Sequence, residues 1–221
     1  MPKAVDHEAR RRELAEAVWR VVLRDGVERA SVRTVAAEAG WSTGSLRHYF
    51  PTQEALLSFA MELAAATFLE RIAPLQDVTD PRTVLRALAL ELLPLDEQRR
   101  AEMAVWLSFV ARSRVDPSLH EAQRKVNGET QTALRRILTW ARNKGALRPG
   151  VDPVVEALRL HSLLDGLALH ALLDPELFDP ESIVATVDTH LAGLLADTGT
   201  EEHAEDRPER RGDHAGGEAT R

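Results

Sequence analysis

The fold of the first fifty residues is decided by the sequence Ser31-Val32-Arg33-Thr34-Val35-Ala36-Ala37-Glu38-Ala39-Gly40-Trp41-Ser42-Thr43-Gly44-Ser45-Leu46-Arg47-His48-Tyr49-Phe50. Apolar residues recur at helical spacing between Ser31, a good N-cap, and Gly40, a good terminator, which predicts a helix over 32–39. A second short helix is predicted over 43–48. Two helices joined by a short turn that contains glycine form a helix-turn-helix pattern.

The rest of the chain also has the pattern of helices. We predict helices over 6–24, from Thr52 to about Ala73, and near 81–93, 97–112, 117–143, 153–173 and 180–196. Four of the five Asp-Pro pairs precede these segments, and Asp and Pro both favour a helix start. The fifth, Asp174-Pro175, predicts a turn between two helices. Strand signals are nearly absent, so the predicted fold is all-α with about nine helices.

Three segments are predicted. Residues 1–52 form a three-helix unit around the helix-turn-helix, and residues 53–196 form a larger helical bundle. Residues 197–221 hold eight acids, four arginines and four glycines, which predicts a disordered charged tail without an assigned function.

Net positive charge is confined to the first fifty residues, which have nine Lys/Arg against seven Asp/Glu, whereas the remainder has 19 Lys/Arg against 28 Asp/Glu. The first segment therefore approaches an anion more easily than the rest.

The composition narrows the class of protein. Of the 221 residues, 44% are hydrophobic and 29% are charged, which is typical of a globular protein. The absence of cysteine excludes disulfides, thiolate metal sites and a cysteine nucleophile. No apolar run reaches the ~18 residues of a membrane helix, and the start has no hydrophobic signal region, so we expect a cytoplasmic protein without a membrane partner.

The predicted second helix suits the major groove of DNA. Small residues at 43–45 let the backbone come close, and their hydroxyls can bond to phosphates or base edges. Arg47 can reach guanine with two hydrogen bonds, and Tyr49 can reach a phosphate. Other interpretations stay open: an ion pair of Arg47 with the first helix, packing of Tyr49 beside Phe50, or a helical corner that never meets DNA. Trp41 is expected to be a wedge between helices, and residues 10–12 to be a solvated face or an arm that follows phosphates.

A longer stretch resembles a known family. Gly40-Trp41-Ser42-Thr43-Gly44-Ser45-Leu46-Arg47-His48-Tyr49-Phe50-Pro51-Thr52-Gln53-Glu54-Ala55-Leu56-Leu57 is similar to the N-terminal signature of the TetR family of transcriptional regulators, and the specific match covers about residues 10–57. Residues 163–167 are similar to the penultimate helix of the BetI-like branch. The resemblance implies a repressor that binds a pseudo-palindromic operator as a homodimer and is released by a small-molecule effector. It implies that residues 1–52 are the DNA-binding domain and that residues 53–196 are the ligand-binding and dimerisation domain.

Three positions depart from the family pattern. The family usually has an aromatic residue in place of Arg47, a smaller aliphatic one in place of Trp41, and often a lysine in place of Gln53. These departures affect base preference and place more of the phosphate contact on Arg33, His48 and Tyr49. The expected DNA-contacting residues are Ser31, Arg33, Ser42, Thr43, Gly44, Ser45, Arg47, His48 and Tyr49.

The segment 153–173 is apolar nearly all round, so one face is expected to cover the core and another to meet a second subunit. The family resemblance implies that this helix and 180–196 form a four-helix dimer interface. The expected interface residues are His161, Leu164, Asp165, Gly166, Leu169, Val187, Leu191 and Leu194. For ligand binding we single out the aromatic residues and methionine of the middle helices, although such residues are more often core: Phe68, Met103, Trp106, Phe109 and Trp140.

Two other functions compete with a DNA-binding regulator. An enzyme would need a nucleophile and base, a metal-ligand spacing or a phosphate loop, and the sequence has none of these patterns, so we expect no cofactor and no metal. A protein-interaction module would keep the helix-turn-helix as a structural element only. The tryptophans favour a cationic or flat aromatic effector.

Overall fold

The computed structural model describes residues 7–196, apart from the side chains of 7–9, 11, 12 and 118, and the tail expected over 197–221 lies outside this range. The described chain is all-α, apart from one isolated β-bridge between Leu147 and Leu195. Its helices are α1 (His7–Asp25), α2 (Val32–Ala39), α3 (Thr43–Tyr49), α4 (Gln53–Ile72), α5 (Pro81–Glu91), α6 (Glu97–Ser113), α7 (Pro117–Asn143), α8 (Pro153–Leu173) and α9 (Pro180–Leu194), with two short 3-10 helices, η1 (Val27–Arg29) and η2 (Ala73–Asp77).

The helix starts follow the Asp-Pro pairs. Asp80, Asp152 and Asp179 are N-caps whose carboxylates accept hydrogen bonds from backbone N–H groups of the first turn. Asp116 does the same for α7 by accepting from the N–H of Leu119 at 3.1 Å. These bonds satisfy donors that the helix itself leaves unpaired. The fifth pair, which begins at Asp174, lies in the turn between α8 and α9, as predicted.

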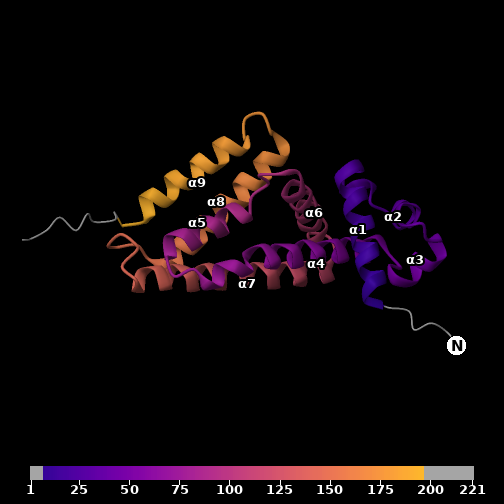
Figure 1. Ribbon diagram of the computed structural model, residues 1–221, viewed down its shortest axis with the longest axis horizontal. Coiled ribbons are helices and arrows are strands. Elements are labelled where there is room, and N and C mark those ends of the chain that lie inside the picture. The colour runs from indigo at the N-terminus through magenta and orange to yellow at the C-terminus, as the bar shows by residue number, and fades with distance from the viewer. Residues whose placement is uncertain (1–6, 197–221) are drawn as a thin grey trace, which may run out of the picture.

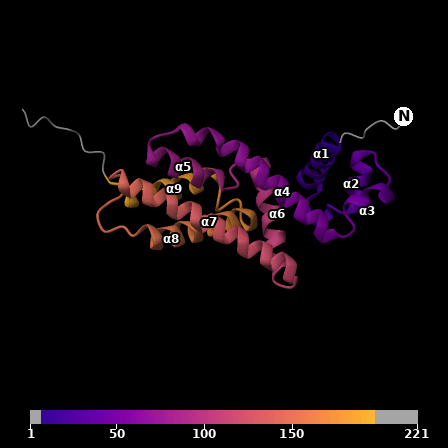
Figure 2. The same cartoon turned by 90° about the horizontal axis from the view of Figure 1, so that it is seen from below.

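The molecule is elongated, with α1, α2 and α3 at one end (Figures 1 and 2). The other end contains α5, α7, α8 and α9, and α4 and α6 lie between the two. None of the helices within residues 7–196 is sufficiently long and apolar to cross a membrane.

Two hydrophobic cores correspond to the two ends. The first contains buried residues of α1, α2 and α3 together with the first turns of α4 as far as Ala60. It also includes Val105 and Phe109 of α6, which are 0% and 4% exposed. The first core therefore extends beyond the boundary expected at residue 52. The second core is built from α5, α7, α8 and α9 and the loops beside them.

The middle of the molecule is held by a buried ion pair. Glu102 of α6 is 2% exposed, and both its oxygens accept hydrogen bonds from the guanidinium of Arg71 at the end of α4, at 2.9 and 2.8 Å. Arg71 also donates to Glu91 of α5 at 2.7 Å. These carboxylates raise the pKa of Arg71 above its ordinary value. The pair joins three helices, and loss of one partner would leave a buried charge uncompensated.

Candidate functional site

The helix-turn-helix is built from local hydrogen bonds. The Ser31 hydroxyl accepts from the N–H of Thr34 at 3.2 Å, and the Thr34 hydroxyl accepts from the N–H of Ser31 at 2.8 Å, which is a capping box at the start of α2. Gly40 ends α2 with φ of +69°, a left-handed conformation that glycine adopts without steric cost. The Ser42 hydroxyl then accepts from the N–H of Ser45 at 3.0 Å and begins α3.

Two buried anchors set which face of α3 points outward. Leu46 is 0% exposed and Phe50, just after the helix, is 7% exposed, and both belong to the first core. The ring of Phe50 packs against Phe59 of α4 with their centroids 4.9 Å apart. The opposite face of α3 is therefore turned to solvent.

Most of the predicted DNA-contacting residues are exposed to solvent on α2 and α3. The exposed members are Arg33, Ser42, Thr43, Gly44, Ser45, Arg47, His48 and Tyr49, whereas Ser31 is half-buried. The hydroxyls of Ser31 and Ser42 are already used as helix caps. A Cβ on Gly44 would meet no other atom closer than 3.9 Å, so its small size leaves room for an outside partner rather than for this chain.

The side chains of Arg47 and Tyr49 both reach solvent. Arg47 is exposed and makes no ion pair with any acid whose side chain the structure describes. Other arginines form the ion pairs of the helix-turn-helix with α1: Arg20 and Arg24 of α1 donate to Glu38 of α2 at 2.8 and 2.7 Å. These two hydrogen bonds hold the pKa of Glu38 below its usual range, and the bond from Arg24 has the larger effect. Tyr49 is 40% exposed.

Trp41 is the wedge that was predicted. The indole is half-buried between α1 and α3 and packs against the first core. Gln53 has a structural role that the sequence did not suggest, because its amide donates to the carbonyl of Ala30 at 2.6 Å and ties the start of α4 to the loop before α2.

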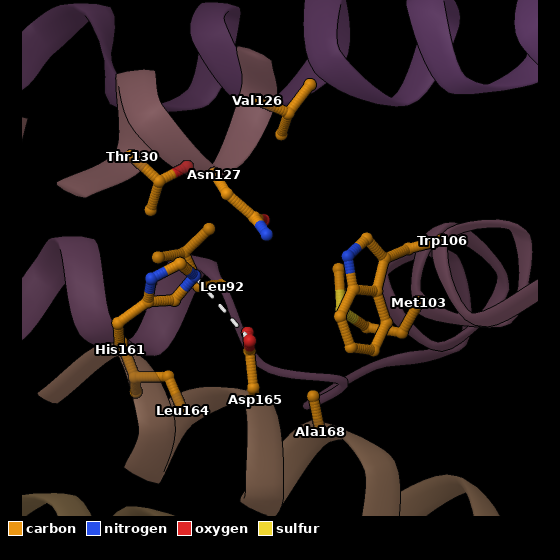
Figure 3. Close-up of a pocket in the computed structure, with 10 residues that line it drawn as sticks. All are labelled: Leu92, Met103, Trp106, Val126, Asn127, Thr130, His161, Leu164, Asp165 and Ala168. Atoms are coloured by element: carbon orange, nitrogen blue, oxygen red, sulfur yellow. Dashed lines mark ion pairs between the residues drawn. The ribbon is translucent and has the colours of Figure 1, made fainter. Parts of the chain in front are cut away.

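The second candidate site is a cavity of about 110 Å³ between α6, α7 and α8 (Figure 3). It is lined by Leu92, Met103, Trp106, Val126, Asn127, Thr130, His161, Leu164, Asp165 and Ala168. Of the five predicted ligand residues, Met103 and Trp106 line this cavity. The other three need correction. Phe109 is buried in the first core, Phe68 of α4 is not among the lining residues, and Trp140 lines a separate hollow beside Arg136 on α7.

One carboxylate dominates the charge of this cavity. The amide of Gln131 donates to Nδ1 of His161 at 2.7 Å, so the ring proton of a neutral His161 is on Nε2. That atom lies 3.6 Å from Oδ2 of Asp165. In Figure 3 the Asp165 carboxylate lies between the His161 ring and the indole of Trp106. Desolvation raises the pKa of Asp165, and the neighbouring His161 lowers it by a smaller amount.

Four of the eight expected dimer residues need correction. Leu164, Val187, Leu191 and Leu194 are 0–4% exposed within one chain, because they form the second core, so they are not available to a second subunit. His161 and Asp165 line the cavity, with Leu164 beside them. Gly166 and Leu169 are half-buried. The exposed apolar residues of α8 are instead Val154, Val155, Leu158 and Leu173, with exposed fractions of 50–67%.

Two family models match this chain. Residues 14–58 match the model described as bacterial regulatory proteins, tetR family, and residues 81–196 match that of the BetI-type transcriptional repressor C-terminal domain. The second match alone covers more than half of the chain. The chain belongs to the TetR family of transcriptional regulators. Because this is a family of regulators, the comparison decides against the enzyme alternative.

Several TetR-family relatives span nearly the whole chain. The HTH-type transcriptional regulator PksA of Bacillus subtilis is 39% identical over 89% of this chain and 95% of its own. The crystal structure of a transcriptional regulator from Rhodococcus sp. Rha1 is 34% identical, with a TM-score of 0.70 over 82% of this chain and 94% of its own. SmeT is the repressor of a Stenotrophomonas maltophilia multidrug efflux pump. The structure of its complex with triclosan is 26% identical in sequence, with a TM-score of 0.66 over 91% of this chain and 100% of its own.

The raised pKa of Asp165 predicts that Asp165→Asn stabilises the protein near neutral pH. A raised pKa means that folding penalises the carboxylate, so the penalty is present above the folded-state pKa and disappears below the unfolded value of about 3.9. We expect thermal unfolding to show a higher Tm for the variant at pH 7.5 and no difference at pH 3.5. A lower Tm at pH 7.5 would contradict the assignment.

Proposed function

We propose that this TetR-family regulator is a ligand-responsive repressor. A homodimer places two copies of α3 in successive major grooves of a pseudo-palindromic operator, and a small molecule in the cavity between α6, α7 and α8 releases it. The observation that carries the proposal is the outer face of α3, where Arg47 is exposed and has no ion pair with the described acids, while Leu46 anchors the opposite face. An arginine without an acid partner keeps its donors for a base or a phosphate.

The side chains around α3 divide into two kinds of contact. Arg47 lies in the last turn of α3 and can donate two hydrogen bonds to a guanine. Arg33 in the first turn of α2, His48 and Tyr49 are also exposed and suit phosphates, which fix position rather than sequence. Thr43, Gly44 and Ser45 allow the close approach of the duplex.

The first prediction from this proposal concerns Arg47. We expect the wild-type protein to select defined sequences from a random duplex pool, and Arg47→Ala to relax preference at one base pair of each half-site by about 1–3 kcal/mol. Arg135→Ala, an exposed arginine on α7, is the matched control and should leave the selected sequence unchanged. If Arg47→Ala and Tyr49→Ala both bind like wild type, the helix-turn-helix is a structural element only.

The proposed dimer uses the outer face of α8. Val154, Val155 and Leu158 are half-exposed there, and two hollows beside Leu163 and His190 open between α8 and α9. A two-fold axis would set the apolar side chains of one copy against the same face of the other, as an isologous interface requires. The family membership supports a dimer, and two half-sites one helical turn apart are then read together.

The second prediction tests this face. Leu158→Glu places a charge at the centre of the proposed interface, so we expect a monomer at micromolar concentration in sedimentation velocity and operator affinity reduced by about 100-fold. Leu69→Glu changes a leucine of α4 that is 60% exposed and should leave the dimer intact. A dimeric Leu158→Glu variant with unchanged DNA affinity would contradict the proposal.

The effector that best fits the cavity is a small organic cation with an apolar group. Among the lining residues, Asp165 supplies a carboxylate and His161 has its Nδ1 satisfied by Gln131. Trp106 presents an indole on the opposite side of that carboxylate (Figure 3), and an indole and a carboxylate both attract a cation. The other lining residues are mostly apolar and would contact the uncharged part.

The third prediction compares three probes of one shape. We expect benzylammonium, positive at pH 7.5, to quench tryptophan fluorescence and release the operator at lower concentration than neutral benzyl alcohol or anionic benzoate. Asp165→Asn should lose this preference while it stays folded, because the substitution removes only the charge. Affinity should also fall as pH falls through the raised pKa of Asp165. Equal binding of all three probes would exclude a cation site.

A further inference from the structure

Three side chains meet at the edge of the proposed DNA surface. The guanidinium carbon of Arg10 on α1 lies 5.0 Å from the ring centroid of Trp41. The rings of Trp41 and Tyr49 approach edge to face, with centroids 5.7 Å apart and planes at 64°. The indole Nε1 is directed at Glu13 at 3.4 Å. One tryptophan therefore joins the first turns of α1 to the end of α3, which lie together at the same end of the molecule in Figure 1.

Arg10 differs from the other described arginines of α1. Arg20 and Arg24 have their charges compensated by Glu38, with Glu16 and Asp25 close by. Arg10 is exposed and has no ion pair with an acid whose side chain the structure describes. Its guanidinium lies over the face of an aromatic ring instead, and none of the described acids cancels its positive charge.

The way in which Arg10 is held leaves its donors available. A cation–π contact uses the flat face of the guanidinium, whereas a phosphate accepts hydrogen bonds from its N–H edges. The indole thus orders a long side chain without occupying its hydrogen-bonding groups. This ordering reduces the rotamer entropy that Arg10 loses when it binds an anion.

We propose that Arg10 contacts the phosphate backbone of the operator and that Trp41 is the positioning residue that holds Arg10 and Tyr49 for it. The partner is duplex DNA beside the groove that α3 enters, and the inference rests on the DNA-binding function proposed above. Arg10 adds a phosphate contact from α1, outside the helix-turn-helix. Trp41 links this contact to the one made by Tyr49, so the two are formed from a single preordered cluster.

The test is the salt dependence of operator binding by the full chain. Removing one phosphate contact makes the slope of log K against log salt shallower by about 0.9, so Arg10→Ala should reduce it by about 1.8 for a dimer with two half-sites. Trp41→Leu should reduce the slope by at least as much, and Trp41→Phe, which keeps an aromatic face, should restore most of it. Arg135→Ala should leave the slope unchanged.

A double variant separates positioning from simple loss of stability. If Trp41 acts through Arg10, Arg10→Ala combined with Trp41→Leu should weaken binding no more than Trp41→Leu alone. The Tm of each variant shows whether it is folded at the assay temperature, and Arg10→Ala changes an exposed residue in any case.

Three results would overturn the inference: an unchanged salt slope in Arg10→Ala, equally weakened binding in Trp41→Phe and Trp41→Leu, or additive effects in the double variant. Failure of the underlying function is distinguishable, because wild-type protein would then show no sequence-selective binding. A wild-type protein that binds selectively while Arg10→Ala behaves identically rejects the role of Arg10 alone.

Discussion

The position of α6, which is part of the first core and packs against the second through Met103, is the constraint on which the rest of the arrangement depends. Val105 and Phe109 complete the core beneath the helix-turn-helix, while Met103 and Trp106 of the same helix line the cavity. Glu102 fixes this helix to the end of α4 through a buried pair with Arg71. A rigid helix cannot move at one of these positions without moving at the others. The DNA-facing end and the cavity are therefore mechanically continuous in a single chain.

The arginines show how the protein separates structural charge from charge that is left for a partner. Arg20, Arg24 and Arg71 are paired with acids and hold helices together. Arg33 and Arg47 are exposed at the helix-turn-helix and have no ion pair with the acids that the structure describes. The protein has a net negative charge, so a local positive surface depends on arginines that are not paired with acids.

Asp165 shows the opposite balance between stability and function. Its side chain is 50% exposed and lines the cavity beside Trp106 and His161, and partial desolvation raises its pKa. A carboxylate with a raised pKa that faces a cavity is a candidate ligand contact. The neighbouring His161 has its Nδ1 satisfied by Gln131 and compensates the carboxylate only in part.

The sequence by itself determined the helices and the helix-turn-helix, because these depend on signals within a few residues of one another. Ser31, Gly40 and the aspartates before each proline act on adjacent backbone groups, so their effect is visible in the chain. The outward face of α3 followed in the same way from Leu46 and Phe50.

Only the tertiary structure decided which face of each long helix is buried. Helix α8 is apolar nearly all round, so its sequence did not show which face is buried. Leu164 lies in the core while Leu158 is exposed. Phe109 and Met103 are likewise both apolar residues of α6, yet one lies in the first core and the other in the cavity wall. The pairing of Arg71 with Glu102 and the contact of Arg10 with Trp41 join residues about 30 positions apart. Local spacing contains no information about such contacts, because they depend on how the helices cross.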